Sequence, residues 1–195
     1  PCERAAALMS ASDAAPPPDA GPLPEALVGD SDGFSTGQAP MTHLPGATIV
    51  GLPTQNDIAS SLDASSPTVL IDADSGDLVP HFAELDMNEP DPAERAIMIR
   101  PVVRLRDDAR YVVAIRHVVD EDGAEVAPSP AFGALRDDVE TGDDRVDGRR
   151  DAYEDIFAIL EDAGVDRDDL QIAWDFNTAS TENNTAWLLS MRDQA

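Results

Sequence analysis

The sequence predicts a mainly β (α+β) fold with inserted and C-terminal helices, and two segments carry that prediction. Residues 110–119, RYVVAIRHVV, form an apolar run that the turn-forming pair Asp122-Gly123 follows. Residues 170–178, LQIAWDFNT, alternate apolar and polar side chains, the period of two that a strand with one buried face requires. No set of reactive residues is as clear as this framework. The face predicted to be buried consists of Leu170, Ile172, Trp174, Phe176 and Thr178.

Three further strands are predicted ahead of residue 110. The first, TVLID, leads into a turn rich in Asp and Gly. The second contains Pro80, which cannot donate to a strand ladder and so favours an edge position. In the third, Pro101 interrupts the apolar pattern and predicts two short strands or a bend. In chain order these segments are 68–72, 78–85 and 96–105.

Two longer helices are predicted in the C-terminal third. In residues 149–163 seven apolar side chains recur at helical spacing, and Gly164 stands where a C-cap glycine belongs. Residues 181–192 form the last helix, which Ser180 can cap.

Shorter helical segments are expected in two places. One is a short helix over residues 55–62. The other lies in the insertion 127–148, which is rich in Asp, Arg and Pro and is expected to hold at most one helical turn around residues 131–135. The charge of this insertion predicts that it stays outside the core.

Net charge is the strongest constraint that composition sets. The 195 residues include 39 acidic and 13 basic side chains, a net charge of −26, and every basic residue is arginine. Such a surface repels nucleic acid and anionic membranes, and the sequence has no apolar run long enough to predict a membrane span. Salt tolerance and the codon bias of a high-G+C genome would each explain the composition, and the sequence leaves both open.

The first 45 residues differ in composition from the rest. They carry eight of the 16 prolines, and such a segment buries too little apolar surface to fold alone. We expect a disordered tether over 1–45, a domain over 46–180 and a C-terminal helix over 181–195. Because the chain starts at Pro1, it is expected to be a mature product or a fragment. Cys2 is the single cysteine, and a spare thiol and a lipid anchor are both open interpretations of it.

Four phrases between residues 66 and 180 carry a family resemblance. They are SPTVLIDADSG from residue 66; IRP with Leu105; RYVVAI leading to Asp122-Gly123 and PSPAF; and AGV leading to AWDFNT. In these phrases the chain resembles the bacterial immunoglobulin-like N-terminal domains of large secreted hydrolases and lipoproteins, including virulence-type lipases. The resemblance implies an immunoglobulin-like β-sandwich, with the catalytic domain lying beyond Ala195 and outside this chain.

One short motif matches a catalytic pattern. Residues 33–37, GFSTG, fit the G-x-S-x-G elbow of serine hydrolases, with Ser35 as the nucleophile. That elbow needs a buried strand before the serine and a helix after it, and neither is predicted here. His43, His81 and His117 lack the spacing of a zinc site, and surface or strand-end positions are expected for the latter two. We therefore assign no catalytic residue and no cofactor.

Aspartates beside glycine turns form the one chemically suggestive set. Calcium prefers six to eight oxygen ligands, which clustered carboxylates supply. Asp72, Asp74 and Asp77 surround a glycine turn and are the first candidates for a calcium site. Turn chemistry alone also favours Asp next to Gly, so a purely structural role is the alternative.

The last helix carries an apolar stripe of Trp187, Leu188 and Met191. We expect it to contact a C-terminal domain or a partner chain. The sequence as a whole indicates a noncatalytic accessory or structural module of a secreted or cell-surface bacterial protein, associated with a hydrolase. The alternative is a stand-alone acidic, calcium-dependent adhesion or self-assembly module, and a serine hydrolase using Ser35 is the third hypothesis.

Overall fold

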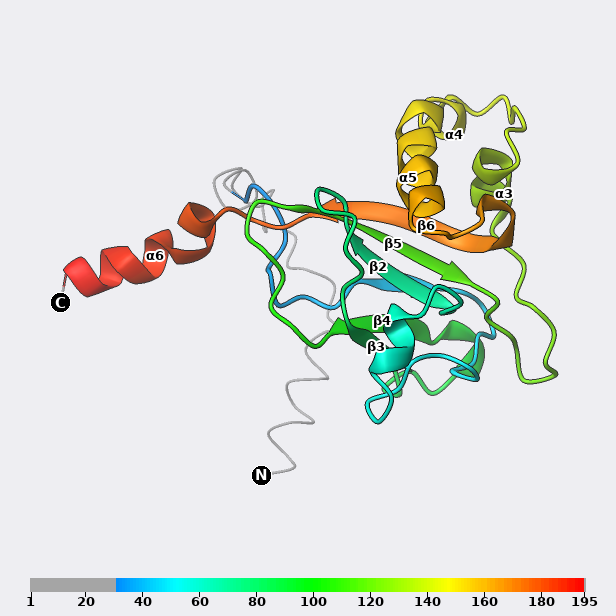
Figure 1. Cartoon of the computed structure of the whole chain (residues 1–195), viewed down its shortest axis with the longest axis horizontal. Coiled ribbons are helices and arrows are strands. Elements are labelled where there is room, and N and C mark those ends of the chain that lie inside the picture. Colours follow the sequence, from blue (N-terminus) through cyan, green and yellow to red (C-terminus); the bar gives the residue numbers. More distant parts are fainter. Residues whose placement is uncertain (1–30, 195) are drawn as a thin grey trace, which may run out of the picture. The chain divides into compact units, whose positions relative to one another are not determined.

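The computed structural model describes residues 31–194, and the folded unit begins at Asp32 (Figure 1). Cys2 and the part of the expected tether from residue 1 to residue 30 lie outside the described residues. In the described part of the chain, two three-stranded antiparallel sheets combine with four α-helices. The fold is therefore a mixed α+β fold, with more helix than the mainly β expectation allowed.

The central sheet has the strand order β2-β5-β6. The middle strand β5 (Arg110–Arg116) pairs antiparallel with β2 (Thr68–Asp72) on one side and with β6 (Leu170–Asn177) on the other. Every residue of β2 is buried, as is all of β5 after its first residue. A strand buried in this way has apolar side chains on both faces, which explains why the VLI and YVVAI runs do not alternate with polar residues.

The second sheet has the strand order β1-β4-β3. Its strands are β1 (Met41–His43), β3 (His81–Leu85) and β4 (Ala96–Pro101). β3 is an edge strand, as Pro80 predicted. β4 is one strand that ends at Pro101, and the chain bends at residues 102 and 103, so the bend rather than two short strands is observed.

One hydrophobic core lies between the two sheets. Ile97 and Ile99 of β4 face Tyr111, Val113 and Ile115 of β5, and all five side chains are buried. The ring of Tyr111 stacks on Phe176 with centroids 5.6 Å apart. Buried side chains of both sheets therefore contribute to one shared core.

A second core covers the opposite face of the central sheet. It joins Val69, Ile71 and Val112 of the sheet to helices α3 (Pro130–Arg136) and α5 (Arg150–Asp162), which lie over this face in Figure 1. The expectation that the insertion stays outside the core is wrong. Phe132 and Leu135 of α3 are buried, because their apolar side chains lie on the sheet side of an otherwise charged segment.

Local capping explains where α3 begins and where α5 ends. Ser129 caps α3 by accepting the backbone N–H of Phe132 at 3.2 Å, and Pro130 occupies the first turn. Gly164 follows α5 with φ of 79°, a left-handed conformation that glycine adopts without strain. The predicted helix 149–163 is thus confirmed to within a residue at each end.

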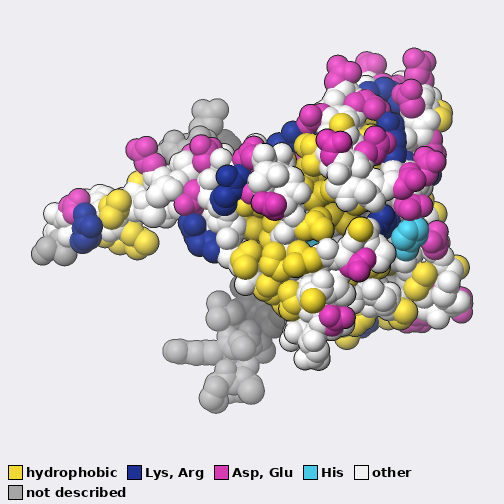
Figure 2. All heavy atoms as spheres, viewed as in Figure 1, with side chains coloured by type: hydrophobic (Ala, Val, Ile, Leu, Met, Phe, Trp, Pro, Cys, Tyr) yellow, Lys and Arg dark blue, Asp and Glu magenta, His cyan; other side chains and the backbone are white. Residues whose placement is uncertain are grey.

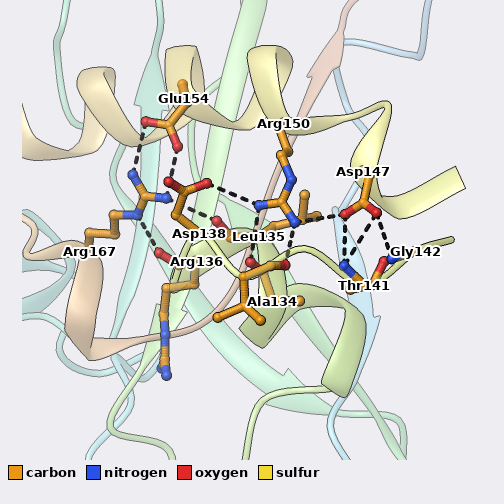
Figure 3. Close-up of polar contacts among 11 residues, drawn as sticks. Ala134, Leu135, Arg136, Asp138, Thr141, Gly142, Asp147, Arg150, Glu154 and Arg167 are labelled. Atoms are coloured by element: carbon orange, nitrogen blue, oxygen red, sulfur yellow. Dashed lines mark hydrogen bonds and ion pairs between the residues drawn. The ribbon is translucent and has the colours of Figure 1, made fainter. Parts of the chain in front are cut away.

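Arginines hold α3 to the rest of the layer (Figure 3). Arg167 donates to the carbonyls of Leu135 and Arg136 and pairs with Glu154 of α5 at 2.8 Å. Arg150 donates to Ala134 O and pairs at 2.7 Å with Asp147 in α4 (Asp144–Asp147). Cations at the carbonyl end of a helix stabilise it, so these arginines fix a short helix that would not persist alone.

The predicted period of two in β6 holds only after residue 171. Trp174 and Phe176 pack on the core between the sheets, but Leu170 packs on the helical side. The cause is a register shift opposite Ile115 and Arg116, which places Leu170 rather than Gln171 opposite Arg116. Gln171 is buried at this register shift. Its side chain makes hydrogen bonds that the backbone of a paired strand residue would otherwise make.

The folded unit begins earlier than the expected boundary at residue 45. Phe34 donates its N–H to Asn177 O and accepts from Ala179 N, at 2.9 and 2.7 Å. Gly33 lies so close to Thr178 that an added Cβ would be 2.5 Å from its carbonyl carbon. Residues 41–43 form β1 on the edge of β4. Apolar contacts of Phe34 and backbone pairing of β1 incorporate this segment, although its proline content resembles a tether.

Two further elements are shorter than predicted. The helix expected over residues 55–62 is a 3₁₀ turn, Ala59–Leu62. β5 ends at Arg116 because His117 has φ of 55°, which turns the chain out of the sheet. As a consequence Val118 packs into the core between the sheets.

Candidate functional site

The C-terminal helix α6 (Thr181–Asp193) extends from the end of β6 beyond the sheets (Figure 1). Its first turn is attached to the domain by three acceptors. Ser180 caps the helix through the N–H of Asn183 at 3.1 Å, and Asp32 accepts the N–H of Ser180 at 3.1 Å. Asp107 accepts from the Thr181 hydroxyl at 2.8 Å and from the Asn184 amide at 3.0 Å.

Asp107 is held in the charged form that favours this attachment. Arg104 pairs with it at 2.7 Å and is the largest cause that keeps the pKa of Asp107 below its ordinary value, followed by the hydrogen bond from Thr181. A carboxylate beside a helix N-terminus is favoured by the helix dipole. Asp107, together with Asp32 and Ser180, therefore fixes the direction in which α6 leaves the domain.

Beyond this first turn, α6 exposes the predicted apolar stripe. Trp187 is 80% exposed, Leu188 68% and Met191 60%. Side-chain hydrogen bonds from residues 185–194 stay within the helix. Figure 2 shows apolar side chains on this helix, in contrast to the acidic surface over α3 to α5. Leu189 is also exposed, on the other side of the helix, and the sequence interpretation had not included it.

An uncovered helix of this length is only marginally stable in water. Isolated helices shorter than about 12–15 residues form weakly, because most helical stability in proteins comes from packing an apolar face. α6 has 13 residues and packs none of its apolar side chains. A partner that covers the stripe would therefore stabilise α6.

The structure places Arg106 between two of the candidate calcium ligands. Its guanidinium binds Asp72 through two hydrogen bonds, of 2.6 and 2.8 Å, and Asp74 through one of 2.7 Å. Asp77 lies at the same turn, where its N–H donates to Ser75 Oγ. In residues 31–194 no group of three His, Cys, Asp or Glu side chains is arranged to hold a metal ion. A calcium ion at Asp72 and Asp74 would have to displace Arg106. Comparing the melting temperature in calcium with that in chelator tests the predicted calcium site.

The ion pair also sets the charge state of Asp72. Burial is the largest effect and raises its pKa, but the bonds from Arg106 and from the N–H groups of Asp74 and Ser75 together outweigh it. The pKa of Asp72 therefore lies below its ordinary value. The stabilisation is present above the pKa of the unfolded state and is lost as the pH falls through the lowered folded pKa.

Replacing Arg106 with glutamine is expected to lower the free energy of unfolding by about 1–2 kcal/mol at pH 7, because Asp72 would keep its charge in a buried position without its cationic partner. Urea unfolding measures this change. Arg145→Gln is the matched control, since Arg145 and its partner Asp143 are exposed; we expect it to cost at most about 0.5 kcal/mol. Equal effects of the two substitutions would contradict the role given to Arg106.

The structure does not bring the candidate serine to a histidine. Ser35 Oγ accepts the N–H of Gly37 at 3.2 Å in a local turn. Among the described residues, the histidines bond elsewhere: His43 to Ala93 O, His81 to Thr68 and Val79, and His117 to Glu125. The G-x-S-x-G match is thus a loop that packs Phe34 against β6, with no strand and helix flanking Ser35.

His81 is the first residue of β3, the strand-end position that was one of the two expected, and it is fully buried rather than at the surface. Its Nδ1 lies 2.8 Å from Val79 O and its Nε2 2.9 Å from the Thr68 hydroxyl. Since Val79 O can only accept, Nδ1 carries the proton and Nε2 accepts from Thr68. Burial lowers the pKa of His81 and exceeds the opposing effect of these two hydrogen bonds. His81 is therefore neutral at pH 7.

Acidification below the unfolded pKa of histidine, about 6.5, is expected to destabilise the domain. The unfolded chain then binds a proton that folded His81 does not bind, so the free energy of unfolding falls by up to about 1.4 kcal/mol per pH unit until the folded pKa is reached. Urea unfolding between pH 7.5 and 5 measures this slope. His81→Gln is expected to reduce it, and His43→Gln, which removes a partly exposed ring, is the matched control. The same slope in all three proteins would refute the assignment.

The comparisons with known proteins identify no relative. No protein-family model, no curated protein and no solved structure matches the chain. The resemblance to immunoglobulin-like domains therefore stays a prediction. No helix of the described residues has the length and apolar character needed to cross a membrane.

Proposed function

We propose that this chain is a noncatalytic accessory or structural module of a secreted or cell-surface bacterial protein, associated with a hydrolase, and that α6 joins the module to a neighbouring domain or chain. The observation that carries the proposal is the apolar stripe of Trp187, Leu188 and Met191, which is exposed on a helix whose first turn is fixed to the domain. Trp is among the residues most enriched at the energetic centres of protein interfaces.

The charge distribution supports this choice of docking element. The whole chain carries a net charge of −26, which opposes close contact with another acidic surface. In residues 181–194, by contrast, Glu182 and Asp193 are the acidic side chains and Arg192 the basic one. α6 is therefore an element that can approach a partner with little electrostatic cost, while the acidic surface keeps the rest of the module hydrated.

The sandwich interpretation is part of the same proposal. Two sheets that share one core support it, as does the resemblance of residues 66–180. The strand orders β1-β4-β3 and β2-β5-β6 differ from the four-plus-three arrangement of immunoglobulin constant domains. The module would therefore be a variant of that sandwich, with a helical layer on one sheet.

Site-specific photocrosslinking in cells that make the native protein tests the docking role. A photoreactive phenylalanine analogue replaces Leu188 in one variant and Ala186, on the opposite side of α6, in the control. We expect Leu188 to crosslink to one neighbouring domain or chain, identified by mass spectrometry, and Ala186 to give little product. Equal yields from both positions, no product from either, or a crosslink between two copies of this chain would overturn the proposal.

A further inference from the structure

A groove distant in sequence from α6 combines an apolar floor with an acidic rim. It has a volume of about 520 Å³ and lies between three loops, 46–50, 85–95 and 120–122. Ala47 and Leu85 at its floor belong to the core between the sheets. Val50 and Met87 in its wall are 67% and 69% exposed. Ligand pockets in proteins have volumes of roughly 300–1,000 Å³ and mostly apolar linings, and this groove has both properties.

Hydrogen bonds fix the loops that form the groove. Thr48 donates to Val119 O from its N–H at 2.9 Å and from its hydroxyl at 2.8 Å, which ties loop 46–50 to the acidic turn. Gly46 N–H donates to Ala93 O at 3.3 Å and ties the same loop to loop 85–95. The groove is therefore formed before any ligand arrives, so binding loses little free energy to the ordering of these loops.

The charges around the groove select the ligand. The lining includes four carboxylates, of Asp91, Asp120, Glu121 and Asp122, and one cation, Arg95, which donates to Glu89 O. Asp91 and Asp120 each use Oδ1 to accept backbone N–H groups. Glu121 and Asp122 make no side-chain hydrogen bond or ion pair within the described residues. An excess of carboxylates beside exposed apolar side chains complements a ligand that is both apolar and cationic.

A second copy of this chain supplies few such cations. The chain contains no lysine. Within residues 31–194 every arginine except Arg149 already donates to an acceptor of its own chain, either a carboxylate or a carbonyl. We therefore expect the cations to come from a different molecule.

We infer that the groove binds a short basic amphipathic segment of another polypeptide, with apolar side chains against Val50 and Met87 and Lys or Arg side chains against Glu121 and Asp122. This site is separate from the α6 stripe and does not depend on the role proposed for α6. Attraction between the acidic rim and a basic segment is strongest at low ionic strength and weakens as salt is added.

Titration of the full chain with three synthetic peptides tests the inference by calorimetry and by amide chemical shifts. The probe is an acetylated and amidated six-residue peptide of Leu and Lys; in the second peptide Glu replaces Lys, and in the third Ser replaces Leu. We expect the Leu-Lys peptide to bind and to shift the amides of 46–50, 85–87 and 120–122. The other two peptides should bind at least tenfold more weakly. Equal binding of the Ser-Lys peptide would mean that charge alone acts, and would overturn the inference.

Matched variants locate the site. Val50→Ser and the double variant Glu121→Gln with Asp122→Asn are each expected to weaken binding of the Leu-Lys peptide about threefold to tenfold at low salt. Val103→Ser replaces a similarly exposed valine outside the groove, and Glu161→Gln with Asp162→Asn replaces an exposed acidic pair on α5; both should leave binding unchanged. All substituted side chains are exposed, so folding is retained. Loss of affinity in the controls, or none in the groove variants, would refute the site. Concentration-dependent dimerisation that Val50→Ser abolishes would show that a second copy occupies the groove instead.

Discussion

A chain that begins at Leu44 is expected to unfold at a temperature far below that of a chain that begins at Ser31. The shorter chain lacks β1 and therefore exposes the edge of β4. It also loses the two backbone hydrogen bonds that Phe34 makes with Asn177 and Ala179. The carbonyls of Thr36 and Pro40, which accept from Leu105 N and Ile99 N, are lost as well. With net contributions of about 0.5–1.5 kcal/mol per hydrogen bond, we expect a loss of about 3–6 kcal/mol, or roughly 10–20 °C.

A single substitution tests the same segment without shortening the chain. Gly33→Val would place its Cβ against backbone atoms of Thr178 and Ala179, at about 2.5 and 2.6 Å, so one of the two segments must move. Gly37→Val is the control, since an added Cβ at Gly37 contacts only Ser35 Oγ, at 3.9 Å. Calorimetry of the four proteins measures the effects. Equal melting of the chains that begin at Ser31 and Leu44 would mean that residues 31–43 contribute nothing to the fold, as the tether interpretation required.

Replacing Gln171 with leucine is expected to be among the most destabilising single changes in the domain. Its side-chain amide donates to Val118 O and Val126 O, at 2.9 and 2.6 Å, and its carbonyl accepts from Val118 N at 2.8 Å. Leucine has a similar size but leaves Val118 N–H and Val126 O buried without partners. Each unsatisfied group costs about 1–3 kcal/mol, so we expect a loss of roughly 2–5 kcal/mol in urea unfolding.

Gln55→Leu is the matched control for this substitution. Gln55 is exposed in a loop, and exchanges at such positions change stability by less than about 0.5 kcal/mol. If Gln171→Leu proved neutral or stabilising, apolar burial would outweigh the hydrogen bonds, and the bulge in β6 would not depend on the Gln171 side chain.

The sequence predicted well those strands and helices whose position depends on a local pattern of apolar and capping residues. β2 and β5 lie in unbroken apolar runs, and α5 has its apolar side chains at helical spacing before Gly164. Ser180 caps α6 as expected. In each case the signal lies within about a dozen residues, where periodicity and capping are decisive.

The features that sequence reasoning missed depend on contacts between distant residues. Gln171 meets Val118 across 53 positions, and the resulting shift reverses the face of Leu170. Phe34 joins β6 across more than 140 positions, which no local proline count reveals. Asp107 bonds to Thr181 of α6, which lies 74 positions later in the sequence. Arg106 binds Asp72, which lies 34 positions earlier. Only the three-dimensional fold shows that these carboxylates bind arginine and helix N-terminal groups.

Amide hydrogen exchange of residues 186–193 in the purified chain is the measurement that tests the central claim most directly. A helix that nothing covers opens locally at little free-energy cost, so we predict exchange that is orders of magnitude faster than in β5. The same amides should become protected when the native assembly is isolated intact. Slow exchange in the purified monomer, comparable to that of β5, would show that α6 is already covered without a partner and would contradict the docking role of Trp187, Leu188 and Met191.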